Sequence, residues 1–468
     1  MRNSAPFFSR FNWIGICVLQ MLIFSATIEA QEPVDLKVRF SSDDQCRITC
    51  DLQHTGSVLV EPDASTEKVL TLPLDVNAKI SFYQRINGTD QAIRFYDEAQ
   101  AEIKLEKGTT KPAIEESNRL IVARLKQRSG ERVEFASITD VLQQSELELI
   151  QNAADPLTLA SIFTKEEVKV GAKWRPSNTA LAKLLMVQHI SKSNVQMMLK
   201  SANSEVARVY IMGSVTADVD DVVTKMDISG IAILDQKTEM VSSLKLGISE
   251  IRAPGQIAPG FEGKTKIAMR IDTGANTPQL SNAALAKHTK GRKIRRQLKW
   301  KSETGQFVLK YEPRWKMIAA EPDAAVLRYI DKDELLTQCN IVHLPSRPVD
   351  KPLDLEVFKT EVAKIVSADK GAALVSANAV PMSDNNTALR VVVSGEEEGL
   401  PVNWFYYHVS CKDGRQVTLV FTLAESVAKR VTTIADKLIS ELQFLPMPEQ
   451  KASTVAKSKM NEPSQRNR

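Results

Sequence analysis

Residues 206–252 decide the fold, because they contain three apolar stretches separated by short polar turns. The stretches are VARVYIMGSVTA (206–217), MDISGIAILD (226–235) and MVSSLKLGISEIR (240–252). Similar stretches flank them at 195–201 and 264–271. The turns carry Asn, Asp, Ser and Gln-Lys residues, which favour reversal of the chain. Five consecutive strands with short connections predict a curled antiparallel sheet or part of a barrel.

The rest of the first half adds further predicted strands and two short helices. Helices are expected at 146–150, behind Ser145 as N-cap, and after a cap at Ser177 or Asn178. Together with the meander, these elements predict a β-rich domain over residues 31–286. Period-two alternation indicates strands at Val34–Phe40, Ile80–Tyr83, Gln91–Tyr96 and Val168–Trp174.

A basic run at 287–301, with eight Lys or Arg residues and no acid, indicates a domain junction. Residues 302–446 form the second predicted domain, and the polar, aperiodic residues 447–468 are typical of a disordered tail. We therefore expect an α+β fold: a curled antiparallel sheet or half-barrel with short helices, then an antiparallel sheet covered by helices. The second domain has predicted strands at 307–311, 325–329, 339–344, 388–393, 404–410 and 416–422 and amphipathic helices at 355–366 and 427–442.

The first thirty residues are typical of a secretion signal. Arg2 and Arg10 form a basic start, and the apolar stretch Trp13–Ala26 follows. Its 14 residues are fewer than the roughly 20 that a membrane-spanning helix needs. We expect cleavage after Ala30 and export to the periplasm or the cell exterior, with an uncleaved N-terminal anchor as the alternative.

Export makes the cysteines informative, because disulfides form in oxidising compartments. Four remain once Cys17 leaves with the signal: Cys46, Cys50, Cys339 and Cys411. The simplest pairing joins Cys46 to Cys50, which are close in sequence, and Cys339 to Cys411, which lie in one predicted domain. Buried free thiols are the alternative.

Two parts of the chain resemble known folds. Trp404–Ser410, Val417–Thr422 and the helix after them resemble the end of PsbP-like α/β/α sandwich domains, over about residues 300–446. That resemblance implies a layered sheet and brings no catalytic motif with it. Val168–Trp174 and Gly230–Thr238 resemble uncharacterised exported bacterial proteins whose curled sheet is similar to that of periplasmic lipoprotein carriers. Such a fold alone does not establish ligand binding.

One motif looks catalytic. Asp272-Thr273-Gly274-Ala275 is similar to the signature of retropepsin-like aspartic proteases, in which two aspartates share a proton and activate water. This chain contains one copy, and few glycines that could form a flap follow it. The motif therefore favours a strand end with a glycine turn, and an aspartic hydrolase that uses Asp272 is the alternative.

No metal, cofactor or other catalytic site is predicted. The histidines do not lie at metal-ligand spacing from one another or from Asp or Glu, and we interpret His343 and His408, beside Cys339 and Cys411, as packing residues. The sequence also lacks a nucleophile elbow, a phosphate-binding glycine loop and a dinucleotide fingerprint.

The basic run is the main binding feature that the sequence offers. It suits an anionic envelope component such as lipid headgroups or cell-wall polymer, with a solvated linker as the alternative. Export and scarce aromatic residues disfavour nucleic acid. We expect an exported, non-enzymatic binding or scaffolding protein of the envelope; a carrier of a lipid or other hydrophobic ligand in the curled sheet is the main alternative. The candidate contacts in the run are Lys290, Arg292, Lys293, Arg295 and Arg296.

Overall fold

A computed structural model describes most of the chain. The predicted secretion signal and the predicted tail lie outside the described residues. Among the described helices, none is both long enough and apolar enough to cross a membrane. The structure describes residues 32–39, 43–60, 69–88, 90–106, 108–125, 133–219, 222–255, 259–289, 294, 296–331, 334–349, 351–366, 371–382 and 386–446.

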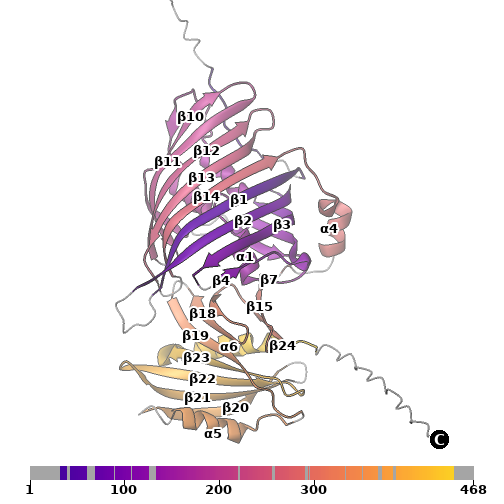
Figure 1. Ribbon diagram of the computed structural model, residues 1–468, viewed down its shortest axis with the longest axis vertical. Helices are drawn as coiled ribbons and strands as arrows, with labels where there is room; N and C mark the ends of the chain where they lie inside the picture. Colours follow the sequence, from indigo (N-terminus) through magenta and orange to yellow (C-terminus); the bar gives the residue numbers. More distant parts are fainter. Residues whose placement is uncertain are drawn as a thin grey trace, which may run out of the picture.

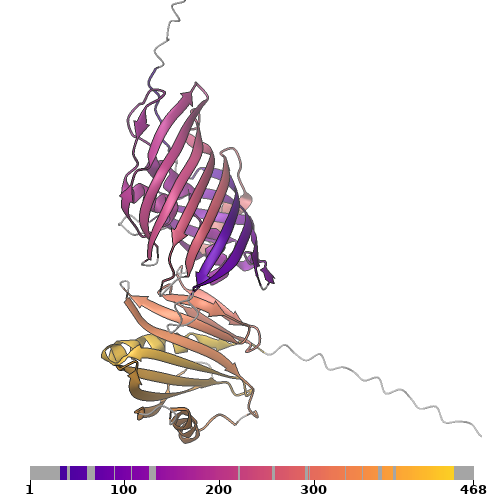
Figure 2. The same ribbon diagram turned by 60° about the vertical axis from the view of Figure 1, so that its left-hand side comes forward.

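Thirteen strands form one antiparallel sheet, which curls along its length (Figures 1 and 2). Eleven of them follow the order β6-β5-β3-β2-β1-β14-β13-β12-β11-β10-β8, while β4 pairs with β3 and β9 with β11. The strands are β1 (Gln45–Val60), β2 (Leu70–Ile86), β3 (Gln91–Leu105), β4 (Gly108–Thr110), β5 (Leu120–Leu125), β6 (Val133–Ser137), β8 (Lys173–Trp174), β9 (His189–Ser193), β10 (Gln196–Ala202), β11 (Val206–Val219), β12 (Val222–Asp235), β13 (Met240–Arg252) and β14 (Gly260–Asp272).

Alternation along the strands gives this sheet a buried face and an outer face. In β13, for example, Leu244, Leu246 and Ile248 are buried, whereas Lys245 is exposed. Side chains of successive residues point to opposite faces of a strand, so the buried residues share one side. The sheet curls around this buried, concave side (Figure 2).

Three short helices cover the concave side: α1 (Gln144–Ile150), α2 (Pro156–Leu159) and α3 (Asn178–Leu185). Their buried side chains belong to the same hydrophobic core as the buried face of the sheet. Of the two predicted caps of α3, Ser177 is the N-cap, since its Oγ accepts a hydrogen bond from the Ala180 amide at 3.1 Å. The N-cap of α1 is Gln143 rather than the predicted Ser145.

A buried ion pair ties the sheet to α2. The Arg94 guanidinium on β3 donates two hydrogen bonds of 2.7 Å to the carboxylate of Asp155 and one of 2.9 Å to Oε1 of Gln84. The side chains of Arg94 and Asp155 are 1% and 3% exposed. Asp155 also caps α2, because its Oδ1 accepts from the Leu157 amide at 3.0 Å. A charge is costly to bury alone, so each partner holds the other in place.

The C-terminal part contains a seven-stranded antiparallel sheet between two helices (Figure 1). Alternate residues of its strand β22 pack in opposite directions. Trp404 and Tyr406 contact the cluster that contains α5, whereas Phe405 and Tyr407 belong to the core that contains α6. The elements are β17 (Trp315–Ala320), β18 (Ala324–Asp331), β19 (Glu334–Leu344), β23 (Gln416–Ala424), β22 (Leu400–Ser410), β21 (Thr387–Glu397) and β20 (Ala373–Val380), in sheet order, with α5 (Leu355–Val366) and α6 (Ala428–Ser440).

A four-stranded sheet joins the two parts of the molecule. In it β7 (Leu142–Gln143) runs parallel to β15 (Leu298–Ser302), which pairs with β16 (Phe307–Tyr311) and, through it, with β24 (Leu442–Phe444). A short α-helix, α4 (Asn282–Thr289), precedes β15. The backbone of the first part is therefore hydrogen-bonded to the strand that opens the second.

The chain is mostly antiparallel sheet with few helices, so it is richer in β-structure than an even α+β mixture. The predicted bounds of β13 and β16 are confirmed to the residue, and the predicted helix with Leu355, Phe358, Val362 and Val366 on one face is α5. The predicted strand at Val34–Phe40 is wrong, because Val34 forms only an isolated bridge, with Val168, while Leu36 is buried in the core. This segment alternates because its apolar residues face the core, but apart from that bridge its backbone does not pair with a neighbouring strand. The predicted strand at 168–174 is likewise reduced to that bridge and β8.

Candidate binding surface

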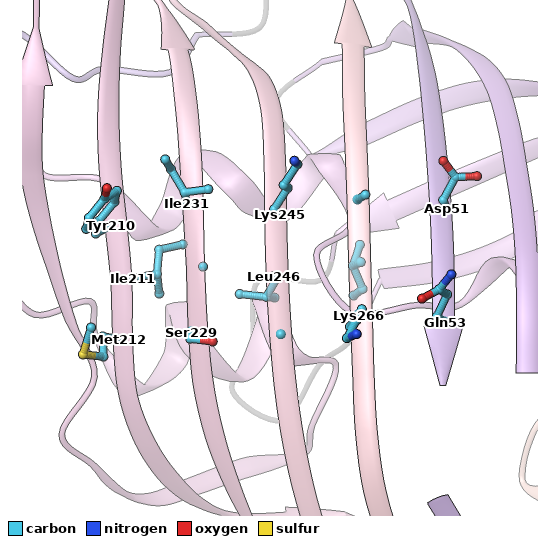
Figure 3. A pocket seen from close by; sticks show the side chains of 14 residues that line it. Asp51, Gln53, Tyr210, Ile211, Met212, Ser229, Ile231, Lys245, Leu246 and Lys266 are labelled. Carbon is cyan, nitrogen blue, oxygen red and sulfur yellow. The ribbon is translucent and has the colours of Figure 1, made fainter. Parts of the chain in front are cut away.

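The outer face of the curled sheet carries cross-strand rows of side chains that helices do not cover. One row joins Met198, Tyr210, Ile231 and Lys245 on β10 to β13 and continues to Ala268 and Asp51. The next row contains Met212, Ser229, Gly247, Lys266 and Gln53. Figure 3 shows the part of these rows from Tyr210 and Met212 to Asp51 and Gln53, with helical ribbon behind the strands.

A depression of about 650 Å³ lies across these two rows. Gly247 lies between Ser229 and Lys266 in its row and has no side chain, so the surface is hollow there. Depressions of this size are typical of ligand and partner sites. The outer side chains around it include Asp51, Gln53, Tyr210, Met212, Ile231, Lys245 and Lys266 (Figure 3).

One half of the depression is apolar. Met212 is 66% exposed and Tyr210 is 36% exposed, and Ile231 lies between their strand and β13. The apolar side chains on these neighbouring strands form a contiguous patch rather than scattered residues.

The other half is basic. Lys245 and Lys266 are exposed, on β13 and β14, and neither forms an ion pair with a described carboxylate. A second hollow of about 810 Å³ shares Lys245, Asp51 and Ala268 with the first and extends along the same strands toward Arg270. Among described residues, no ion pair with a carboxylate is formed by any of the exposed outer-face cations of β10 to β14: Lys200, Arg208, Lys225, Lys245, Lys264, Lys266 and Arg270.

Of the five predicted basic contacts, the structure describes Arg296. Lys290, Arg292, Lys293 and Arg295 are outside the described residues. Arg296 lies 2.6 Å from a carboxylate oxygen of Glu134 in the first part of the chain.

Lys299, in the same run, connects the two parts of the molecule. Its Nζ lies 3.0 Å from Oε2 of Glu115 and 2.8 Å from Oδ2 of Asp140, and its side chain is 12% exposed. Burial lowers the pKa of Lys299, but the hydrogen bonds and charges of the two carboxylates outweigh it and raise this pKa overall. These two described cations are thus bound within the chain.

All four cysteines of the described chain are free thiols, so the predicted disulfides are absent. Cys46 and Cys50 lie on β1, four residues apart, which places them about 13 Å apart along an extended strand. A disulfide requires Cα atoms within about 7 Å. Cys339 on β19 is separated from Cys411, which follows β22, by the intervening strand β23. The alternative of buried thiols fits Cys46, Cys50 and Cys339.

Asp272 is the last residue of β14 and is exposed. Its Oδ1 accepts a hydrogen bond from the Gly274 amide at 3.0 Å, which is a turn contact. No hydrogen bond joins it to a second carboxyl group among the described residues, so the geometry matches the predicted strand end with a glycine turn.

The histidines do not gather metal ligands in the part of the chain that the structure describes, where no group of three His, Cys, Asp or Glu residues could hold an ion. His408 is 2% exposed and its ring lies 5.5 Å from that of Phe358. It is a packing residue, as predicted.

The sequence contains a signal for the outer-face depression in two continuous apolar runs. One continuous apolar run is Val209–Met212, and a second one is Ile231–Leu234. A half-buried strand alternates, whereas a continuous apolar run indicates apolar residues on both faces. The two runs therefore indicate that β11 and β12 carry apolar side chains on the outer face of the sheet as well as on the buried face.

Comparison with known proteins gives little support for a family. No family model matches the chain, and the curated proteins contain no match. The PsbP protein of the cyanobacterium Synechocystis is 18% identical, with 33% of this chain and 95% of that chain covered and a TM-score of 0.25. A Mog1 mutant is 10% identical, with 32% and 96% covered and a TM-score of 0.25. Lipovitellin is 7% identical, with 52% and 27% covered and a TM-score of 0.29. The PsbP-like resemblance is therefore weakly supported, and none of these matches carries a functional argument.

Proposed function

We propose that this chain is an exported, non-enzymatic binding protein of the cell envelope, which docks an acidic and apolar segment of a partner protein on the outer face of its curled sheet. The observation that carries the proposal is the depression in which exposed Tyr210 and Met212 lie beside Lys245 and Lys266, neither of which pairs with a carboxylate among the described residues. Contiguous exposed apolar surface with a polar rim is typical of interaction sites.

Charge selects the partner. A segment that places apolar side chains over Met212 and a carboxylate beside Lys245 and Lys266 complements both halves of the depression. Such complementarity mainly sets specificity and the rate of association. Asp51 on the rim of the depression and Asp227, on the same face of β12, restrict the carboxylate of the segment to the side of Lys245 and Lys266. An anionic membrane is the rival partner, and the vesicle experiment below tests it.

The concave side is less suited to a ligand than the outer face. Helices α1 to α3 pack there in one core with the sheet, and the Arg94–Asp155 ion pair fixes α2. A lipid carried on the concave side would have to displace these helices, which argues against the carrier alternative.

Site-specific photo-crosslinking tests the docking surface. A photoreactive phenylalanine analogue at Met212, expressed in the native host, should capture a partner, which mass spectrometry identifies. Reversing both lysines of the depression, with Lys245→Glu and Lys266→Glu, should lower the yield of that same product about tenfold, equivalent to about 1.4 kcal/mol of binding.

The matched control reverses two exposed lysines of the same face outside the depression, Lys225→Glu with Lys264→Glu, and should leave the yield within about twofold. Equal loss in both pairs would reject the site and indicate a general effect of charge. Co-sedimentation of the purified protein with phosphatidylglycerol vesicles, abolished by the Lys245 and Lys266 reversals, would replace the partner protein with a membrane.

A further inference from the structure

The strand β20 forms an open edge of the seven-stranded sheet, because it pairs with β21 alone. Both views place it, with α5, at the end of the molecule far from the curled sheet (Figures 1 and 2). Apart from β21, its backbone has one described hydrogen-bond partner, the side-chain amide of Asn378, which donates to the Ala379 carbonyl at 3.0 Å. The outward N–H and C=O groups of an edge strand are a template for another chain, and a carbonyl can accept a second hydrogen bond.

β20 differs from the other terminal strands of the described sheets. At 8 residues it is the longest of them, and it contains no charged residue and no proline. β6 and β17 carry Glu134 and Lys316, and β7, β8 and β24 have at most 3 residues each. Charges, proline, short length and bulges are the usual protection of an edge. A bulge at Val375 interrupts the start of β20 and leaves Ser376–Val380 as a regular edge.

The segment Ser376–Val380 is complementary to itself. A two-fold axis normal to the sheet pairs two copies antiparallel and uses the same surface of each. With the axis at Asn378, this residue lies opposite its own copy, Ala377 opposite Ala379, and Ser376 opposite Val380. None of these pairs contains a charge or a bulky ring, so the strands can reach the usual spacing of about 4.8 Å. The absence of charge favours a second copy over a charged foreign segment.

Such an axis also keeps the two helical layers in register. Ala377 packs against the cluster that contains α5, and Val380 packs against the core that contains α6, so each face continues into the same face of the second copy. α5 packs equally on β20 and β21, which places it about half a strand spacing inside the edge. The two copies of α5 would then lie about 10 Å apart, which is a normal distance for packed helices.

We propose that two copies of the chain pair through β20 and join their seven-stranded sheets into one continuous sheet. The dimer leaves the outer face of the curled sheet free, because β20 lies at the other end of the molecule. It carries two docking surfaces, so an assembly that presents two partner segments binds the dimer more tightly than the monomer. The pairing itself does not depend on the docking surface.

Sedimentation velocity of the full mature chain tests the pairing and should show a reversible monomer–dimer equilibrium at concentrations up to about 100 µM. Asn378→Asp keeps the size of the side chain and places two carboxylates opposite each other at the axis, so association should weaken about tenfold or more. The matched control Ala319→Asp puts the same charge on β17, the other terminal strand of this sheet, at an exposed position. It should leave association within about twofold.

A charge-exchange mixture locates the axis. The Asn378→Asp and Asn378→Lys variants should each stay monomeric, whereas their equimolar mixture should form a heterodimer within about threefold of the native affinity. Unchanged melting temperatures show that the variants fold. A native chain that stays monomeric, an open-ended aggregate, equal loss in Ala319→Asp, or a mixture that stays monomeric would overturn the inference. A monomer that still yields the Met212 cross-link would reject the dimer alone and leave the docking surface in place.

Discussion

Replacing Asp155 by Asn tests whether the buried ion pair holds the helices on the concave side. The substitution keeps the size of the side chain and an oxygen that can still cap α2, and it removes the charge. Arg94 then remains 1% exposed beside a neutral amide. Burial by itself lowers the pKa of Arg94, whereas the charge and hydrogen bonds of Asp155 raise it overall, so the native partner strongly favours the cation.

Removing one partner of a buried ion pair costs about 3–5 kcal/mol. With a urea m-value of about 3 kcal/mol/M, Asp155→Asn should lower the unfolding midpoint of the first part by about 1 M or more. Arg94→Met in the same chain removes the orphaned charge. The double variant should therefore regain most of the lost stability and unfold at a higher urea concentration than Asp155→Asn alone.

Hydrogen–deuterium exchange across a urea series, read on peptides of β3 and α2, measures this midpoint separately from that of the C-terminal part. Peptides of β22 serve as the internal reference and should keep their midpoint. A shift below about 0.3 M for Asp155→Asn, or a double variant less stable than the single one, would refute the role given to the ion pair.

Three further predictions concern the junction, the thiols and acid stability. Lys299→Met should lower amide protection of β15 about fivefold, near 1 kcal/mol for a partly buried pair, whereas Lys301→Met on the same strand should not. Burial raises the pKa of Cys46 and Cys50 to about 12, so Ellman's reagent should modify them only after unfolding; fewer than four reactive thiols in denaturant without reductant would instead indicate a disulfide. Burial lowers the pKa of His408 to about 4, so its contribution is complete above about pH 6.5 and is lost progressively, up to about 3 kcal/mol, as the pH falls from 6.5 to 4. The urea midpoint of the C-terminal part should show this loss, and His408→Gln should flatten the profile.

Local sequence patterns predicted the strands that carry their own alternation. The meander β10 to β14 is an example, since each strand is half-buried and its turns contain residues that favour reversal. β1 was not predicted, although Cys46, Ile48, Cys50 and Leu52 alternate along it, and its two cysteines were predicted to form a disulfide. The strand and that disulfide exclude each other, and only the strand buries all four side chains in the core.

The roles of the charged residues depended on contacts that no local pattern contains. Arg296 and Lys299 belong to a run that reads as a free basic patch, yet their carboxylate partners Glu134, Glu115 and Asp140 lie more than 150 residues earlier. The sequence shows that these residues are positively charged. Whether they are free to bind a partner depends on the carboxylates that the fold brings next to them. The exposed lysines of the sheet, by contrast, are scattered singly along strands, and only their registers bring them to one face.

The joining sheet has a consequence for how the molecule is made. Its strands come from residues 142–143, 298–302, 307–311 and 442–444, so its last ladder, between β16 and β24, closes only when residues 442–444 have been made. Pairings between such distant segments form slowly, because the intervening chain must first be ordered. The first part can therefore assemble its curled sheet early and pair β7 with β15 as soon as residue 302 is available. The edge strand β24 is added last, so a chain that ends before residue 442 would leave the β16 edge of the joining sheet unpaired while β7 still holds β15.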